Sequence, residues 1–331
     1  MIKKITEEAT KNDFECSQNS ITKKSIQRRT KKTYCTLLPL LSKLPGNYTM
    51  LKTKKLINHH TIQRPTEKYK LGISFSGGGA RGILHIGVLE ALHKYGLHPE
   101  IVSGTSIGAF VGVLYASGME PLQILDVIKT SKIYKLIKWK VPSGGLLDIK
   151  KVLSVLKEHI PMDDFASLKI PFCCSVTNLN SGLLEIKNSG KLFQWVLASA
   201  SIPLVFEPQI IGGDTYVDGG ILNNLPAQCI RAQCGVLIGV NVNHNGPEEN
   251  ISGFRAIAER AFRLTMAKNV HESFAICDFI INPPQARLFS IFDFKRANEI
   301  FKIGFEETEG RMAELLDIIG HRKILLENNR Q

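Results

Sequence analysis

Long hydrophobic runs and a secretory signal are both missing from this 331-residue chain. No stretch reaches the roughly 18 consecutive apolar residues that a membrane-spanning helix needs. The first residues, Met1 to Glu8, run quickly into acidic side chains and contain no apolar core, so we expect no signal peptide. These absences predict a cytoplasmic or peripherally membrane-associated protein.

Cysteine is sparse, and its pattern excludes two common uses. The seven cysteines lie at positions 16, 35, 173, 174, 229, 234 and 277. An odd number at this spacing fits neither a disulfide framework nor a zinc site. We therefore expect buried free thiols, which are typical of a reducing compartment.

The net charge of +12 is concentrated at one end of the chain. Residues 1–70 contain 16 Lys and Arg against 5 Asp and Glu, a net +11, which leaves +1 for residues 71–331. We interpret residues 1–68 as a basic, mostly disordered extension. Its apolar patch, Leu37 to Leu41, suits either packing on the domain or contact with anionic lipid. Because the remainder is nearly neutral, we expect no nucleic-acid partner.

The most informative motif is the pentapeptide Gly104-Thr105-Ser106-Ile107-Gly108, which reads G-x-S-x-G. It lies between a strand-like and a helix-like segment. A serine on so tight a turn projects its Oγ out of the sheet, and side chains at the glycine positions would clash. Ser106 is therefore the candidate nucleophile, and its four neighbours form the candidate elbow.

Two further glycine-rich segments strengthen this interpretation. Residues 76–82 follow a strand-like run, and consecutive glycines leave backbone N–H groups free to converge on an anion or an oxyanion. The candidate oxyanion-hole residues are Gly77, Gly78, Gly79, Ala80, Arg81 and Gly82. The second segment places Asp218 before Gly219 and Gly220, in a turn that can project a carboxylate towards another loop.

A dinucleotide-binding site must be weighed, because Gly77, Gly79 and Gly82 also spell G-x-G-x-x-G. That fingerprint needs an acidic residue about 20 positions on, at the end of the second strand. Here the second strand ends in Ser103 and Gly104, and Glu100 lies at its beginning. The pattern therefore favours an oxyanion loop over a nucleotide site.

The three segments in this order, together with residues 198–208 (Ala-Ser-Ala-Ser-Ile-Pro-Leu-Val-Phe-Glu-Pro), resemble the patatin-like phospholipase family. The similarity predicts a hydrolase domain at residues 69–320 and a C-terminal tail at residues 321–331. It implies a three-layer α/β/α sandwich with a mostly parallel central sheet, and a Ser106–Asp218 dyad that hydrolyses acyl esters of phospholipid or lysophospholipid. It implies neither a metal nor a cofactor.

Residue chemistry leaves a second mechanism open. Serine needs a base, and the usual base is a histidine held by a carboxylate. His244 follows a predicted strand and comes after Asp218, which is the chain order of an α/β-hydrolase triad. The alternatives are thus an esterase or thioesterase that uses Ser106, Asp218 and His244, or a lipid-binding protein with negligible turnover. The oligomeric state is open.

Alternating predicted elements support the fold class. Strands are expected at residues 71–75, 100–103, 172–176, 183–186, 215–217, 236–242 and 279–281, with an extended run at 210–216, and helices at 82–95, 107–118, 147–159, 194–199, 253–274 and 294–319. Residues 121–139 mix apolar side chains with regularly spaced lysines. This segment suits either a flap that makes transient contact with a membrane or an ordinary amphipathic helix.

Overall fold

The computed structural model describes residues 68–131, 149–203, 205–244, 246 and 251–328, which all lie within one compact unit, residues 63–331. The Leu37–Leu41 patch, nearly all of the basic extension and residues 132–139 of the flap segment lie outside the described residues. The domain boundaries at residues 68 and 320 stay predictions.

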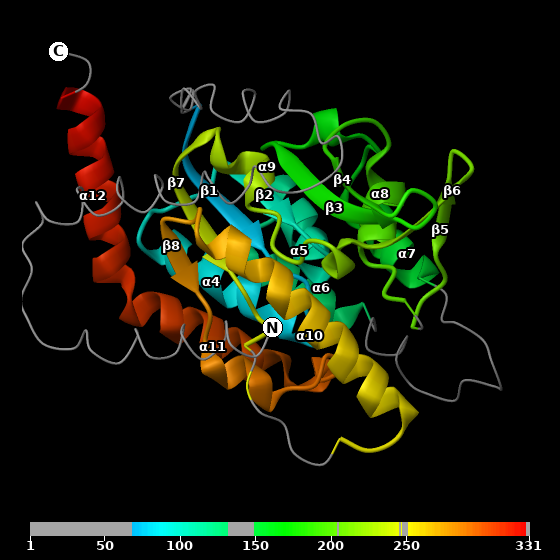
Figure 1. Ribbon diagram of the computed structural model, residues 1–331. Coiled ribbons are helices and arrows are strands. Elements are labelled where there is room, and N and C mark those ends of the chain that lie inside the picture. Colours follow the sequence, from blue (N-terminus) through cyan, green and yellow to red (C-terminus); the bar gives the residue numbers. More distant parts are fainter. Residues whose placement is uncertain (1–67, 132–148, 204, 245, 247–250, 329–331) are drawn as a thin grey trace, which may run out of the picture. The chain divides into compact units, whose positions relative to one another are not determined.

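The described residues form one eight-stranded sheet, in the order β5-β6-β3-β2-β1-β7-β8, with β4 paired to β3 (Figure 1). The parallel part consists of β1 (Tyr69–Phe75), β2 (Ile101–Gly104), β3 (Phe172–Asn178), β7 (Cys234–Val240) and β8 (Phe279–Ile281). The antiparallel part adds β4 (Leu183–Lys187), β5 (Gln209–Ile211) and β6 (Asp214–Asp218). The predicted mostly parallel sheet is confirmed.

Helices cover both faces of this sheet. The face with the larger hydrophobic core is covered by seven of the described helices. They are α4 (Ile83–Lys94), α5 (Ile107–Ala116), α6 (Pro121–Thr130), α7 (Lys150–His159), α8 (Leu192–Ser199), α11 (Ala297–Gly310) and α12 (Met312–Asn328). The other face carries α9 (Gln228–Arg231) and α10 (Phe254–Phe274), which lie in front of the sheet in Figure 1. This is the expected α/β/α arrangement.

Strand alternation divides the apolar side chains between two cores. In β1, Leu71, Ile73 and Phe75 point into the large core that α4 and α5 cover. In β2 and β3, Ile101 and Cys173 point to the opposite face and pack under α9. Because successive strand residues face opposite sides, strands buried on both faces show the near-continuous apolar runs seen in the sequence.

Two predicted elements need correction, and one element was missed. The extended run at residues 210–216 is a hairpin, because Gly212 and Gly213, both with positive φ, turn the chain between β5 and β6. The helix predicted at residues 294–319 is interrupted at Arg311, where α11 ends and α12 begins. The short helix α9 was not predicted.

The described part of the flap segment is an amphipathic helix packed on the domain. In α6, Ile124, Leu125 and Ile128 are buried in the large core, whereas Asp126 and Lys129 are exposed. This part therefore has the structure of an ordinary surface helix. Among the described helices, none combines the length and the apolar composition needed to cross a bilayer.

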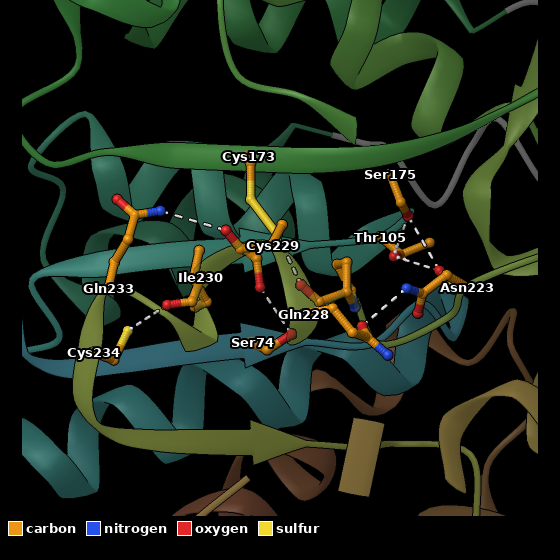
Figure 2. Close-up of a disulfide and its surroundings, with 12 residues drawn as sticks. Ser74, Thr105, Cys173, Ser175, Asn223, Gln228, Cys229, Ile230, Gln233 and Cys234 are labelled. Atoms are coloured by element: carbon orange, nitrogen blue, oxygen red, sulfur yellow. Dashed lines mark hydrogen bonds between the residues drawn. A yellow bond between two sulfur atoms is a disulfide. The ribbon is translucent and has the colours of Figure 1, made fainter. Parts of the chain in front are cut away.

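The prediction of free thiols is wrong for two cysteines. Cys173 of β3 and Cys229 of α9 form a disulfide (Figure 2). Cys174, Cys234 and Cys277 are free, as expected. Sequence spacing did not reveal the pair, because 56 residues separate its members and only the packing of α9 over β3 brings them together.

Candidate active site

The three glycine-rich motifs meet at the carboxyl edge of the parallel strands, where active sites of such sheets gather. Ser106 occupies the turn between β2 and α5 with φ 57° and ψ −125°. It is the only non-glycine residue with positive φ among those that the structure describes. Such a conformation is strained, and strain of this kind marks functional turns. Ser106 therefore has the strained backbone that a nucleophile elbow would require.

Close packing and hydrogen bonds hold this elbow in place. A β-carbon on Gly108 would lie 2.6 Å from the carbonyl oxygens of both Phe75 and Ser76, so any side chain there would push α5 off β1. The Ser106 N–H donates to Ser199 Oγ at 3.0 Å. Ile107 packs against Gly82. This contact joins the elbow to the glycine-rich segment 76–82, which we call the oxyanion loop.

Thr105 ties the elbow to the neighbouring strand. Figure 2 shows its Oγ1 hydrogen-bonded to Ser175 Oγ of β3, at 2.6 Å, while both hydroxyls lie 3.1 Å from the carbonyl oxygen of Asn223. Asn223 lies just beyond the turn formed by Asp218, Gly219 and Gly220, which we call the aspartate turn. The buried hydroxyl pair thus fixes the turn that carries Ser106 against the segment that follows Asp218.

The oxyanion loop presents fewer donors than the sequence predicts. The Gly77 N–H donates to the carbonyl oxygen of Asn224 at 3.2 Å, and the Ala80 N–H donates to that of Ile291 at 2.8 Å. These two N–H groups are therefore already paired. Within the described part of the chain, no backbone hydrogen bond uses the N–H of Gly78 or Gly79. Gly79 has φ 58°, a conformation in which a side chain would be strained.

Two buried polar side chains, one beside this loop and one within it, hold it in place. The buried His85 ring donates from Nε2 to the carbonyl oxygen of Ser76 at 2.8 Å, and burial lowers the pKa of His85 to about 4, so it is neutral at pH 7. Arg81 is buried as well. Its Nε donates to the carbonyl oxygen of Phe289 at 2.7 Å, and its guanidinium also contacts Asn243. Arg81 therefore braces the loop.

Asp218 ends β6 with its carboxyl group buried and directed at the nucleophile. The carboxylate accepts hydrogen bonds from Ser106 and, at 2.7 Å, from the N–H of Gly220. Burial raises the pKa of Asp218 from 3.8 to about 7, while these two hydrogen bonds oppose part of the rise. Gly219 packs directly on Ser175 and lets the turn approach β3. The carboxyl group can thus act as a base near neutral pH.

His244 does not join this pair. Burial and hydrogen bonds with Ser106 and Gly220 account for the shifted pKa of Asp218, and no histidine contributes. The Nδ1 atom of His244 has no hydrogen-bond partner among the described residues. Among the described residues, no hydrogen bond joins His244 to Ser106 or Asp218, as a triad would require.

An apolar pocket opens at Ser106. Its lining residues are Gly79, Ser106, Ile107, Phe110, Ile149, Val152, Ala200, Ile202, Phe206, Ile291, Phe292 and Phe294. Aliphatic and aromatic side chains dominate this lining, which suits a hydrocarbon chain. The described residues contain no group of three or more His, Cys, Asp or Glu side chains placed to share a metal ion.

Sequence reasoning missed several polar residues of the site. Ser199, Asn224, Asn243 and Asn269 form hydrogen bonds with the three glycine-rich motifs or lie against them. One signal was available: Asn224 and Asn243 follow the aspartate turn and the end of β7, and both positions lie at the carboxyl edge of the sheet. Ser199 ends α8 and lies in the 198–208 segment that carries the family resemblance, but nothing in that segment assigns it a contact with Ser106. No local pattern marks Asn269, which lies inside α10.

Comparison with known proteins agrees with this geometry. A sequence model of the patatin-like phospholipase family matches residues 73–228, which include all three glycine-rich motifs. This part of the chain belongs to the patatin-like phospholipase family.

Curated relatives of the patatin-like domain include fungal enzymes named lysophospholipase NTE1. That of Eremothecium gossypii is 28% identical over 239 residues, covering 66% of this chain and 16% of its own length. That of Saccharomyces cerevisiae is 31% identical over 182 residues, covering 52% of this chain and 11% of its own length. The chain thus spans less than a fifth of the length of these curated relatives.

Solved structures similar to the patatin-like fold include VipD from Legionella pneumophila, with a TM-score of 0.38 and 14% identity over 78% of this chain and 75% of that one. Human group IVD cytosolic phospholipase A2 in complex with methyl gamma-linolenyl fluorophosphonate has a TM-score of 0.40 and 11% identity, over 78% of this chain and 60% of that one.

Proposed function

We propose that the protein is a lipid acyl hydrolase that cleaves acyl esters of phospholipid or lysophospholipid through a Ser106–Asp218 dyad. The observation that carries the proposal is the buried Asp218 carboxyl group, hydrogen-bonded to Ser106 and with a pKa of about 7. A base works best when its pKa lies near the working pH, because it is then both ionised and basic enough to take a proton. The family match and the names of the relatives support the substrate class.

In the first half-reaction, the acyl chain lies in the apolar pocket and its ester carbonyl meets Ser106. Asp218 takes the hydroxyl proton as Ser106 Oγ bonds to the carbonyl carbon. We assign the oxyanion hole to the N–H groups of Gly78 and Gly79, which no described backbone hydrogen bond occupies. Losing one such donor typically lowers the rate by about 10²-fold or more. The alcohol leaves with the proton from Asp218, and acyl-Ser106 remains.

In the second half-reaction, water attacks acyl-Ser106, and Asp218 again accepts a proton and returns it to Ser106 Oγ. The substrate comes from a lipid aggregate, so we also propose transient contact with a membrane surface. The proposed chemistry uses neither a metal ion nor an organic cofactor. The same dyad would also hydrolyse small esters and thioesters, so the size of the preferred substrate is a separate question.

Substrate comparison tests the proposal. Wild type and Ser106→Ala are assayed on lysophosphatidylcholine micelles, phosphatidylcholine vesicles, and soluble hexanoyl ester and thioester substrates. We expect wild type to release fatty acid from the lipids with the higher kcat/KM and Ser106→Ala to be inactive. Turnover of the soluble substrates alone would favour the esterase alternative. Lipid binding without turnover of any substrate would identify a binding protein.

A further inference from the structure

Asn224 carries two of the four buried side-chain atoms that lack a hydrogen-bond partner among the described residues. Its side chain is fully buried, yet neither Oδ1 nor Nδ2 is paired. An unpaired buried amide costs free energy and therefore calls for an explanation. The backbone of Asn224 is held firmly, since its N–H donates to Asn269 Oδ1 at 2.9 Å and its carbonyl oxygen accepts from Gly77 at 3.2 Å.

The unpaired amide lies between the oxyanion loop and the aspartate turn. A β-carbon on Gly77 would lie 2.7 Å from Asn224 Oδ1 and 3.0 Å from Ser106 Cβ. A β-carbon on Gly220 would lie 2.9 Å from the same Oδ1 and 3.0 Å from Asp218 Oδ1. Asn224 Oδ1 therefore lies no more than about 6 Å from Ser106 Cβ and from Asp218 Oδ1, close enough for one small molecule to bridge it to the nucleophile and its base.

The chemistry of this oxygen selects its partner. An amide oxygen only accepts hydrogen bonds, so it cannot stabilise an oxyanion, which needs donors. A water molecule suits the position because it has two protons to donate. With one proton directed at Asn224 Oδ1 and the other at Asp218, its lone pair is free to attack a carbon atom bonded to Ser106 Oγ.

We propose that Asn224 binds and orients the hydrolytic water of the deacylation step. This proposal rests on the proposed function. The water oxygen bonds to the acyl carbon of acyl-Ser106, and Asp218 takes one water proton while the other stays hydrogen-bonded to Asn224 Oδ1. The tetrahedral intermediate then collapses with cleavage of the bond from carbon to Ser106 Oγ. Asp218 returns its proton to Oγ, and the carboxylic acid leaves.

Separate measurement of the two half-reactions tests this role. p-Nitrophenyl hexanoate is the substrate, nitrophenol release is followed by stopped flow, and acyl-Ser106 is detected by intact-protein mass spectrometry. Asn224→Leu keeps the side-chain size and removes both polar atoms. We expect acylation within about threefold of wild type and deacylation slower by about 10²-fold, as for other losses of positioning. A nitrophenol burst and accumulation of acyl-Ser106 would follow.

Replacing water by a stronger nucleophile distinguishes water binding by Asn224 from a merely structural role. Hydroxylamine needs no general base, so it should cleave acyl-Ser106 in Asn224→Leu and restore turnover. Rates are divided by the concentration of active sites, which is measured by titration with a fluorophosphonate. This titration counts only folded enzyme. Asn224→Ala, measured in the same way, provides a second variant if Asn224→Leu folds poorly.

Asn223→Leu is the matched control. Its side chain is also buried, but its amide is paired with the N–H of Leu225 and with Gln228. We expect this variant to lose thermal stability and to keep the wild-type ratio of acylation to deacylation. Equal slowing of both half-reactions in Asn224→Leu, or an unchanged deacylation rate, would overturn the role of Asn224. A wild-type protein that forms no acyl-Ser106 would instead overturn the proposed function.

Discussion

Asp218→Asn should stabilise the folded protein at neutral and alkaline pH while it abolishes activity. Burial raises the pKa of Asp218 from 3.8 to about 7, so the folded state binds this proton more tightly than the unfolded state does. Stability from this group is therefore present below pH 3.8 and is lost as the pH rises towards 7. Each unit of pKa difference corresponds to about 1.4 kcal/mol. A charged Asp218 thus costs on the order of 4 kcal/mol above pH 7, and Asn avoids this cost.

Urea unfolding of wild type and Asp218→Asn between pH 4.5 and 8.5 measures the difference. We expect the stability advantage of Asn to be small at pH 4.5, to grow with pH, and to level off above pH 7. Asp126→Asn is the control, because that carboxyl group is exposed on α6 and stays in water in both states. An advantage independent of pH, or a loss of stability at pH 8, would show that Asp218 is not a buried carboxyl group with a raised pKa.

Three further predictions concern the same site. Because Asp218 must be ionised to act as the base, kcat/KM should fall about tenfold per pH unit below 7; a flat profile from pH 5 to 8 would contradict this. Arg81→Met should lower the free energy of unfolding by about 1–3 kcal/mol, because it removes the buried hydrogen bond to Phe289; unchanged stability with a raised KM for phospholipid alone would instead assign Arg81 to the lipid phosphate. Ile202→Trp should narrow the apolar pocket and lower the ratio of long-chain to short-chain ester hydrolysis by about tenfold; an unchanged ratio would place the acyl chain elsewhere.

Local chemistry made the strands and the glycine-rich turns predictable. The apolar runs of β1, β7 and β8 indicate strands buried on both faces, and glycine patterns mark turns that side chains would block. Ser106 and Asp218 are the candidate catalytic residues because each lies in such a turn. Their contact depends on the register that places Asp218 opposite Val176 of β3.

Long-range contacts explain what the sequence did not reveal. Arg311 interrupts the last predicted helix and donates to the carbonyl oxygen of Ile280 at 2.6 Å while stacking on Phe279. In the oxyanion loop, Gly77 and Ala80 lose their free N–H groups to partners more than 140 residues away in the chain. Helical and glycine patterns carry no information about such partners.

Covalent labelling tests the central claim most directly. Wild type, Ser106→Ala, Asp218→Asn and His244→Ala are treated with an alkyl fluorophosphonate, and the modified residue is identified by peptide mass spectrometry. We expect an adduct on Ser106 in wild type and in His244→Ala, strongly slowed labelling in Asp218→Asn, and none in Ser106→Ala. Loss of labelling in His244→Ala, or an adduct on a different residue in wild type, would contradict the Ser106–Asp218 dyad.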